Sequence, residues 1–489
     1  MIDLTRNDAQ IEKNARLCAR QKILLPTYEN MVNPETVPPE IVAELRDIGR
    51  DDVHSRNLFR VTWENEPIEK GGAYSGVNYL EIPSSLTGVS ARIIGLVGKW
   101  FPTGSHKVGA SYSCLAPELI TGHFDPEQNS AVWPSTGNYC RGGAYISRLL
   151  ACKSVAILPM EMSKERFQWL EHMADETIGT PGCESNVKEI FDKCHELSAE
   201  RGAAIFIFNQ FEQMGNHLWH YEVTGPALEK VLKKELGPKG RLAGTCVSSG
   251  SAGTTACGEY LKSRYPAAKL AVSEALQCPT LLSNGFGGHR IEGIGDKHVP
   301  WIHNLRNTDM VVAVDDEQTM RLFRLFNEPA GRKYLKERGV DPAVVDQLDL
   351  LGISSICNII TAIKFAKYYE LNGDDVVMTV FTDSEALYTS RTKELREGRG
   401  AYTRDNAIAD FEIIQQLQTD ALQELSYADQ KRVHNLKYYT WVEQQGKTYE
   451  EIQAQWYDRE YWTRIHTLRP ELDRRITEFN EKVLSYMKE

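Results

Sequence analysis

The sequence has no long hydrophobic run. Nowhere in its 489 residues do about 18 apolar residues follow one another, as a helix that crosses a bilayer requires, and we expect no membrane span. Residues 1–16 are polar and lack the apolar stretch of a secretory signal. We therefore expect a cytoplasmic protein.

Positive charge is also scarce. The chain carries 56 basic and 67 acidic residues, a formal net charge of −11, and an acidic surface argues against a nucleic acid as the main partner. A local basic pocket for one anion is still compatible with this balance, because such a pocket covers little of the surface.

The ten cysteines form no C-x-x-C pair and no compact framework. Several lie in apolar or glycine-rich runs, such as Thr245-Cys246-Val247. We expect buried free thiols in a reducing compartment.

What is present is an alternation of β-rich and helical segments between about residues 90 and 390. The strand candidates are rich in Val and Ile and too continuous to alternate, which is typical of strands covered on both faces in a largely parallel sheet. Their number favours two sheets, and a chain of this length favours two domains. We predict an α/β fold with strands at Ala91–Leu96, Ala131–Trp133, Ser154–Leu158, Ala204–Phe208, Gly244–Val247, Leu270–Ser273, Met310–Val314 and Val376–Phe381.

The two ends of the chain differ from this middle part. Residues 1–60 form a polar arm with one plausible helix at Pro38–Arg46. Residues 401–489 are rich in polar and charged residues, and we predict an all-helical extension that packs on the body or on a second subunit. Apolar residues recur there at helical spacing, Ser426 and Thr448 are candidate N-caps, and Pro470 suits the first turn of a last helix.

The first segment that suggests chemistry is Pro102-Thr103-Gly104-Ser105-His106-Lys107-Val108-Gly109-Ala110. A lysine that forms a Schiff base needs a fixed, partly desolvated position, so that its amine can be neutral. Gly and Ser around it let the backbone approach a flat cofactor closely. A single lysine in such a loop is more often a solvated surface lysine, so this segment alone does not decide.

Two strand-to-helix turns suit anions. Pro134–Gly143 and Ser248–Ala256 each follow a predicted strand and precede a helix. Backbone N–H groups and hydroxyls at a helix N-terminus attract a carboxylate or a phosphate. The second turn is not a Walker A loop, because no Gly-Lys-Ser/Thr follows. A capped turn without a ligand is the alternative for both.

Two later segments complete the pattern. Gly285–Pro300 is rich in glycine, which indicates unusual backbone angles, a close ligand or a flexible surface loop. Thr382-Asp383-Ser384 follows the last predicted strand. A hydroxyl there can bond a pyridine nitrogen; Asp383 is its competitor, and a helix N-cap is the alternative for all three.

In this joint order, the five segments resemble the fold-type II enzymes that depend on pyridoxal 5′-phosphate (PLP), over roughly residues 85–395. The likeness is strongest to the cysteine synthase and cystathionine β-synthase branch of the tryptophan synthase β-like superfamily. Gly250–Thr254 looks like that branch's G-T-G-G-T loop, and Glu292–Pro300 looks like its G-I-G-x-x-F-I-P segment. The resemblance implies a large PLP-binding α/β domain of residues 61–110 and 223–400, and a small mobile α/β domain of residues 111–222.

The resemblance also implies the role of individual residues. Lys107 is expected to be the catalytic and Schiff-base lysine, and Asn138 to bond the cofactor's phenolic oxygen. Ser384, or Thr382 in a shifted alignment, is expected to meet the pyridine nitrogen. The expected phosphate ligands are Gly250, Ser251, Ala252, Gly253 and Thr254, and the expected substrate-binding residues are Ser135, Thr136, Gly137 and Tyr139.

Some positions depart from the branch. His106 is more like tryptophan synthase β chains, and Pro102–Ser105 also looks like threonine synthase. Ala252 replaces a usual glycine, and His298 replaces a usual Phe. Tyr139-Cys140-Arg141 is bulkier than the usual Thr-Gly, which is expected to reshape the substrate pocket.

The implied reaction is β-replacement or β-elimination, through an aminoacrylate, on serine, an O-activated serine or cysteine. Lys107 would remove the α-proton. Threonine synthase-like or dehydratase-like chemistry is the alternative within the enzymes. A non-catalytic regulatory subunit, or an α/β protein that binds another phosphate ligand at 250–254, is the alternative outside them. We expect a small amino-acid substrate, no metal, and a homodimer or higher homo-oligomer.

Overall fold

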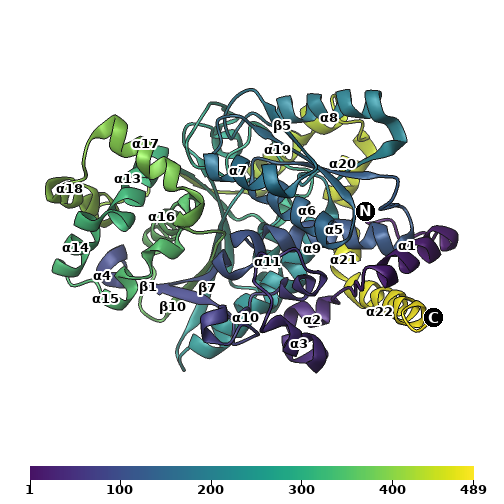
Figure 1. The fold of residues 1–489 in the computed structure, drawn as a ribbon. Coiled ribbons are helices and arrows are strands. Elements are labelled where there is room, and N and C mark those ends of the chain that lie inside the picture. The colour runs from purple at the N-terminus through teal and green to yellow at the C-terminus, as the bar shows by residue number, and fades with distance from the viewer.

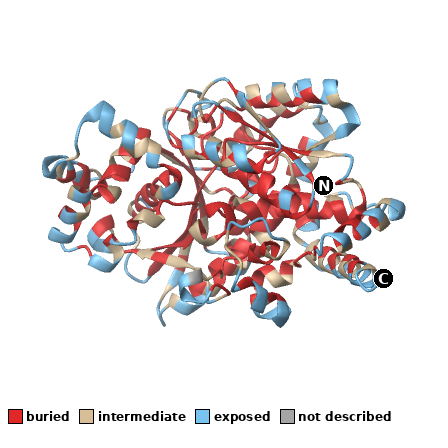
Figure 2. Cartoon of the chain, in the orientation of Figure 1, coloured by how far each residue is buried: buried red, intermediate tan, exposed pale blue. Residues whose placement is uncertain are grey.

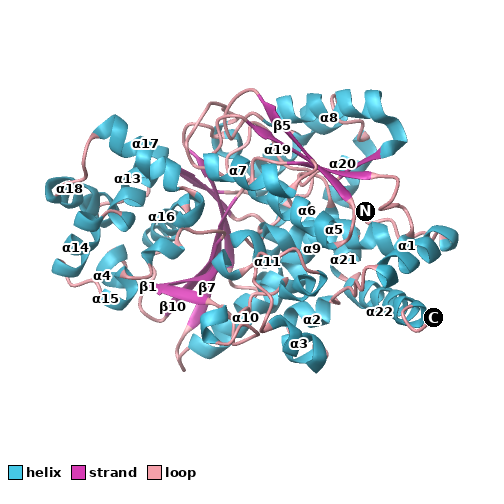
Figure 3. Cartoon of the chain, in the orientation of Figure 1, coloured by secondary structure: helices cyan, strands magenta, loops and turns pink.

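The computed structural model describes residues 1–489, apart from the side chain of Ile68. It contains two separate β-sheets, which are surrounded by helices (Figures 1 and 3). The larger sheet has the strand order β1-β2-β10-β7-β8-β9-β11, and the smaller has the order β5-β4-β3-β6. The strands are β1 (Tyr79–Ile82), β2 (Arg92–Val97), β3 (Ser130–Pro134), β4 (Lys153–Pro159), β5 (Glu176–Thr180), β6 (Ile205–Ile207), β7 (Arg241–Ser248), β8 (Lys269–Ala275), β9 (Met310–Val314), β10 (Asp375–Phe381) and β11 (Leu422–Glu424).

Parallel pairing dominates both sheets. In the larger sheet the five inner strands are parallel, and only β1 and β11 at the edges are antiparallel to their neighbours. All pairs of the smaller sheet are parallel. The predicted α/β fold is confirmed, and each of the eight predicted strands is present at its place.

Three strands escaped the sequence pattern, and all three lie at sheet edges. The β5 strand, Glu-Thr-Ile-Gly-Thr, is half-exposed and has no continuous apolar run. The β11 strand contradicts the prediction of an all-helical extension, because residues 422–424 pair with β9. These three residues carry no strand pattern of their own. They are extended because they pair with the free edge of β9.

Helices cover both faces of the larger sheet. Helix α16 packs on β7 and β10, whereas α11 packs on β7 and β8, on opposite sides in Figure 1. The helices of this part are α4 (Ser84–Thr87), α10 (Gly225–Glu235), α11 (Thr255–Arg264), α12 (Thr280–Ser283), α13 (Asp316–Asn327), α14 (Pro329–Glu337), α15 (Pro342–Val345), α16 (Ile353–Tyr368), α17 (Thr389–Arg399) and α18 (Arg404–Gln415). The smaller sheet is flanked by α6 (Asn138–Leu149), α7 (Lys164–Met173) and α8 (Val187–Arg201). Helix α5 (Lys107–Thr121) packs on α6, and α9 (Met214–Trp219) packs on α5.

The arm and the extension pack on each other and on the body. Helix α1 (Asp8–Arg20) contacts both α22 (Arg469–Tyr486) and α5, and α1 and α22 lie side by side in Figure 1. Asn480 bonds both main-chain groups of Leu25, at 2.8 and 2.9 Å. The remaining helices are α2 (Tyr28–Val32), α3 (Pro39–Leu45), α19 (Tyr427–Asn435), α20 (Tyr449–Tyr457) and α21 (Tyr461–His466).

Buried residues run through the inner strands of both sheets and the helices between them (Figure 2). All ten cysteines are free, and all but the half-buried Cys183 are buried, as expected from their spacing. No helix among the described residues combines the length and apolar character that a bilayer span needs. The smaller sheet falls within residues 130–207, inside the predicted small domain, whose limits at 111 and 222 stay a prediction.

Candidate active site

Lys107 is the first residue of α5, directly after the loop that follows β2. Its Nζ lies 3.2 Å from the hydroxyl oxygen of Ser251, on the loop between β7 and α11. Its neighbour His106 is buried against both Trp63 and Trp219, and the Nε2 of His106 lies 3.3 Å from the Thr382 hydroxyl. The loop thus points the lysine amine across the cavity toward the glycine-rich turn.

Packing dictates a glycine at position 109, two residues after this lysine. A Cβ atom on Gly109 would lie 2.1 Å from the indole ring of Trp219. Trp219 is fully buried, so the ring has no room to retreat. The small residues after Lys107 therefore let the start of α5 approach α9 closely.

Two buried carboxyl groups lie near Lys107, and the sequence analysis assigned a role to neither, although Asp296 lies in the Gly285–Pro300 segment. Burial lowers the pKa of Lys107 to about 8, and the nearby Asp296 and Glu184 partly offset that shift. Burial raises the pKa of Asp296 to about 8 and that of Glu184 well above its usual range. Asp296 Oδ2 and both oxygens of Glu184 have no hydrogen-bond partner. A lysine and an acid that titrate near each other can exchange a proton at neutral pH.

The loop of residues 250–254 leaves its backbone donors free. None of its five N–H groups donates to a protein acceptor. A Cβ atom on Gly250 would lie 2.4 Å from the Gly293 carbonyl oxygen, and one on Gly253 would lie 2.2 Å from Asn216 Oδ1. Free N–H groups at the start of α11 form a site for an anion such as a phosphate.

Ala252 holds a left-handed backbone conformation, with φ of 61°. An alanine there is strained by about 1 kcal/mol relative to glycine, because its Cβ crowds the carbonyl oxygen. We expect Ala252→Gly to raise the free energy of unfolding by about that amount, measured by urea denaturation. Ala256→Gly, in the first turn of α11, is the matched change that should destabilise. A loss of stability in both variants would contradict the strain.

The turn of residues 135–138 precedes α6 and is held from within the protein. Ser135 Oγ accepts the Gly137 N–H at 3.1 Å and the Gln210 amide at 3.2 Å. Gly137 has φ of 149°, a region that favours glycine. Asn138 Nδ2 donates to Asp383 Oδ2 at 2.6 Å, while its Oδ1 has no partner. The N–H groups of Thr136 and Asn138 have no protein acceptor, which leaves them free for a carboxylate.

A buried arginine supports this turn from below. Arg166 of α7 donates to the Thr136 carbonyl oxygen at 3.0 Å and to the Tyr388 hydroxyl at 3.0 Å. It also pairs with Glu292 at 2.8 Å, and both side chains are buried. A Cβ atom on Gly137 would lie 2.5 Å from Arg166 Cδ. An arginine in an amphipathic helix carries no sequence signal for such a role.

Thr382 and Ser384 are the two hydroxyl candidates for the pyridine nitrogen, and Asp383 is their competitor. Thr382 lines the cavity, whereas Asp383 accepts bonds from Asn138 and Tyr388. Ser384 is buried and does not line the cavity, which favours Thr382. Ser354, at the start of α16, also lines the cavity, and the sequence analysis did not select it. The Gly352-Ile353-Ser354-Ser355 run, where this helix begins, could have indicated it.

One cavity collects most of the predicted residues. Gly137, Gly253 and Ser384 lie beside it rather than in its wall. Its predicted lining residues are Lys107, Ser135, Thr136, Asn138, Tyr139, Gly250, Ser251, Ala252, Thr254 and Thr382. Those without a prediction are Gln210, Phe211, Ser248, Gly293, Ile294, Asp296, Ser354, Asn358 and Val380. A lysine amine, free N–H donors and an amide with an unpartnered oxygen fit the aldehyde, phosphate and phenol groups of PLP.

Known proteins with these features are similar over the same region. Residues 100–332 match the family model described as pyridoxal-phosphate dependent enzyme. The chain is 30% identical to the cysteine synthase of Staphylococcus aureus over 290 residues, 59% of this chain and 84% of that protein. It is 28% identical to a probable cysteine synthase of Bacillus subtilis, over 59% of this chain and 85% of the relative.

Solved structures share the fold. The O-acetylserine dependent cystathionine β-synthase of Helicobacter pylori has a TM-score of 0.52 and 24% identity, over 64% of this chain and 94% of that one. The cysteine synthase of Entamoeba histolytica has a TM-score of 0.56 and 18% identity, over 69% and 93%. With the lysine, the free phosphate donors and the family match, the chain belongs to the fold-type II pyridoxal-phosphate-dependent enzymes, in the cysteine synthase and cystathionine β-synthase branch.

Proposed function

We propose that this chain catalyses β-replacement or β-elimination on serine, an O-activated serine or cysteine. The observation that carries the proposal is the Lys107 amine, which faces Ser251 across a cavity that the 135–139 turn also lines. The named activity of the relatives, cysteine synthase, supports this class of substrate.

Each part of the cavity would hold one part of the cofactor. Lys107 would attach its aldehyde carbon, the N–H groups of 250–254 would bind its phosphate, and Thr382 would bond its ring nitrogen. When bound, PLP supplies an electron sink for the bond at the substrate α-carbon. A hydroxyl partner leaves the ring nitrogen unprotonated, which makes this sink milder than a carboxylate partner would.

The protein itself would orient the substrate and move its proton. The free N–H groups of Thr136 and Asn138, with the Ser135 hydroxyl, would bind the substrate carboxylate. The amine of Lys107, displaced by the substrate amine, would then remove the α-proton as general base. Asp296 is placed to accept or return a proton at the lysine, because the two groups titrate in the same range.

A cleft between the two sheets would admit the substrate. Met160 and Phe167 line it from the smaller sheet side, and Met320 and Leu395 from the larger. Glu184, which lies near Lys107, also lines it. Movement of residues 111–222 toward the large domain would close this cleft and exclude water during the reaction.

We also propose that the chain forms a homo-oligomer through its extension. Large apolar side chains are exposed there, and contiguous patches of this kind are typical of contact surfaces. The exposed tyrosines are Tyr427, Tyr438, Tyr439, Tyr449 and Tyr457.

Replacing Asp296 with asparagine is expected to change the pH at which the apoprotein captures PLP. Only the neutral lysine amine attacks the aldehyde, and the charge of Asp296 raises the pKa of Lys107. Removing that charge lowers the pKa of Lys107 below about 8, so the midpoint of PLP capture should move to lower pH. The measurement is the pH dependence of the visible absorbance change after apoprotein and PLP are mixed.

Glu161→Gln is the control for this pH experiment, because Glu161 is an exposed carboxylate of the cleft. Its midpoint should match the wild type. A midpoint for Asp296→Asn that is unchanged or moved to higher pH would contradict the coupling of Asp296 to Lys107.

The proposed reaction is tested with the purified holoenzyme and three donors: O-acetylserine, cysteine and serine. With sulfide present, replacement yields cysteine from O-acetylserine; without a second substrate, elimination yields pyruvate. Turnover of at least one donor supports the proposal and names the leaving group. A holoenzyme that turns over none of them would overturn it and leave the regulatory alternative.

A further inference from the structure

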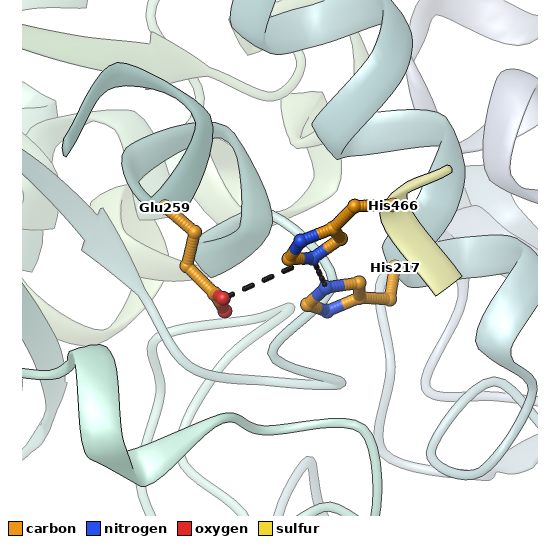
Figure 4. A group of neighbouring side chains, drawn as sticks. All are labelled: His217, Glu259 and His466. Atoms are coloured by element: carbon orange, nitrogen blue, oxygen red, sulfur yellow. Dashed lines mark hydrogen bonds and ion pairs between the residues drawn. The ribbon is translucent and has the colours of Figure 1, made fainter. Parts of the chain in front are cut away.

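Two histidines and a glutamate meet at a point (Figure 4) that does not line the cavity. His217 lies on α9, Glu259 on α11 and His466 at the end of α21 in the C-terminal extension. The two Nε2 atoms are 2.9 Å apart, and His466 Nε2 is 3.9 Å from Glu259 Oε2. The three ligand atoms lie within 4.8 Å of one another.

Burial disfavours the charged form of both imidazoles. Burial lowers the pKa of His217 well below its usual value and that of His466 to about 3. One Nε2–H must then donate to the Nε2 of the other ring. With the ring proton on Nδ1 instead, both Nε2 atoms carry a lone pair that a cation would bind. His217 Nδ1 is buried without a partner, so only one of the two ring nitrogens of His217 is hydrogen-bonded.

Glu259 is a buried carboxyl with little opposing charge. Its Oε2 accepts from the amides of Asn304 and Asn307, each at 2.8 Å, while its Oε1 has no partner. Burial raises its pKa to about 7. Lys437 is a buried cation near Glu259, but its amine donates to the carbonyl oxygens of Trp301 and His303 and to Gln455 Oε1. Burial lowers the pKa of Lys437 well below the usual value.

We propose that His217, Glu259 and His466 bind a divalent transition-metal ion, Zn²⁺ before others. Two imidazole nitrogens and a carboxylate oxygen are a ligand set that zinc accepts, with water in the fourth position. At bond lengths of about 2.1 Å, two ligands of one ion lie no more than about 4.2 Å apart. The separations of 2.9 and 3.9 Å meet that limit. The third, between His217 and Glu259, is at most 4.8 Å, so it needs a side-chain shift of no more than about half an ångström.

The ion joins the C-terminal extension to α9 and α11, the two helices next to the loop of residues 250–254. His217 follows Asn216, whose amide donates to Ser251 at 3.0 Å, and α11 begins directly after Thr254. His466 already stacks on Tyr221, with ring centroids 3.6 Å apart. The site is therefore a clamp that fastens α21 to α9 and α11, and it does not depend on the proposed reaction.

The test uses the full-length holoenzyme after dialysis against a chelator. Co²⁺ is added as a spectroscopic substitute for Zn²⁺, and bound metal, the visible metal absorption and the thermal midpoint are measured. The wild type should bind one Co²⁺ per chain with a new absorption, and Zn²⁺ should raise its thermal midpoint. His466→Gln and Glu259→Gln should each weaken binding by at least about tenfold and abolish that rise.

Two controls separate the clamp from other effects. His172→Gln removes an exposed histidine of α7, and Thr463→Ala removes an exposed side chain of α21; both should bind Co²⁺ as the wild type does. Glu259→Gln keeps an oxygen for Asn304 and Asn307, and His466 lies at the half-buried edge of the cluster, so the fold should survive. A wild type without Co²⁺ absorption, or a His466→Gln variant with wild-type affinity, would overturn the proposal.

Discussion

Replacing Lys107 with alanine is expected to lower the turnover of O-acetylserine by at least about a thousandfold. The variant loses the amine that would attach the cofactor and the base that would remove the α-proton, and proton transfer alone contributes about 10²–10⁴ to a rate. No other lysine lines the cavity, so no second amine is placed to replace it. The measurement is kcat/KM with saturating PLP and sulfide.

Lys297→Ala is the matched control for this experiment. Lys297 is an exposed lysine on the loop that contains Asp296, and its loss should leave kcat/KM within about twofold, since an exposed side chain contributes little to the site. A Lys107→Ala variant with more than about a tenth of the wild-type kcat/KM would contradict the proposed role.

The second large effect is expected from Arg166→Met. Arg166 and Glu292 are both buried, and removing Arg166 leaves Glu292 only its partly exposed partner Arg391. Losing one member of a buried ion pair costs about 3–5 kcal/mol, and with Arg391 still in place the loss should be about 3 kcal/mol. The Thr136 carbonyl also loses its donor, so the 135–138 turn should loosen and KM should rise. Stability is measured by urea denaturation and the substrate affinity by steady-state kinetics.

Arg391→Met serves as the control, because Arg391 pairs with the same glutamate but is partly exposed. It should cost about 1 kcal/mol or less. The double change Arg166→Met with Glu292→Gln should recover part of the loss, since the buried charge is gone. An Arg166→Met variant as stable as Arg391→Met would mean that the buried pair does not hold the turn.

The inner strands of the fold can be predicted from their own residues. Strands covered on both faces must be apolar throughout, so Met310–Val314 is recognisable by itself. The edge strand β11 depends on a partner strand that lies about a hundred residues earlier in the chain. No local pattern records that pairing, which is why the extension was predicted to be helical throughout.

Some residues of the candidate site can likewise be predicted from local sequence, and others cannot. Lys107 and the 250–254 loop lie in turns whose glycines and hydroxyls already suggest a ligand. Arg166 and Glu184 act only through contacts with distant segments: Arg166 with Thr136 and Glu292, and Glu184 through its charge near Lys107. Asp296 lay inside a selected segment, but the resemblance assigned no role to its position.

The central claim is that Lys107 carries the cofactor in this cavity, and peptide mapping tests it most directly. The purified protein is reconstituted with PLP, treated with borohydride to make the lysine linkage permanent, digested and analysed by mass spectrometry. The account predicts the reduced PLP mass on the peptide that contains Lys107, and its absence from that peptide in Lys107→Ala. The mass on another lysine, or on none after reconstitution, would contradict it.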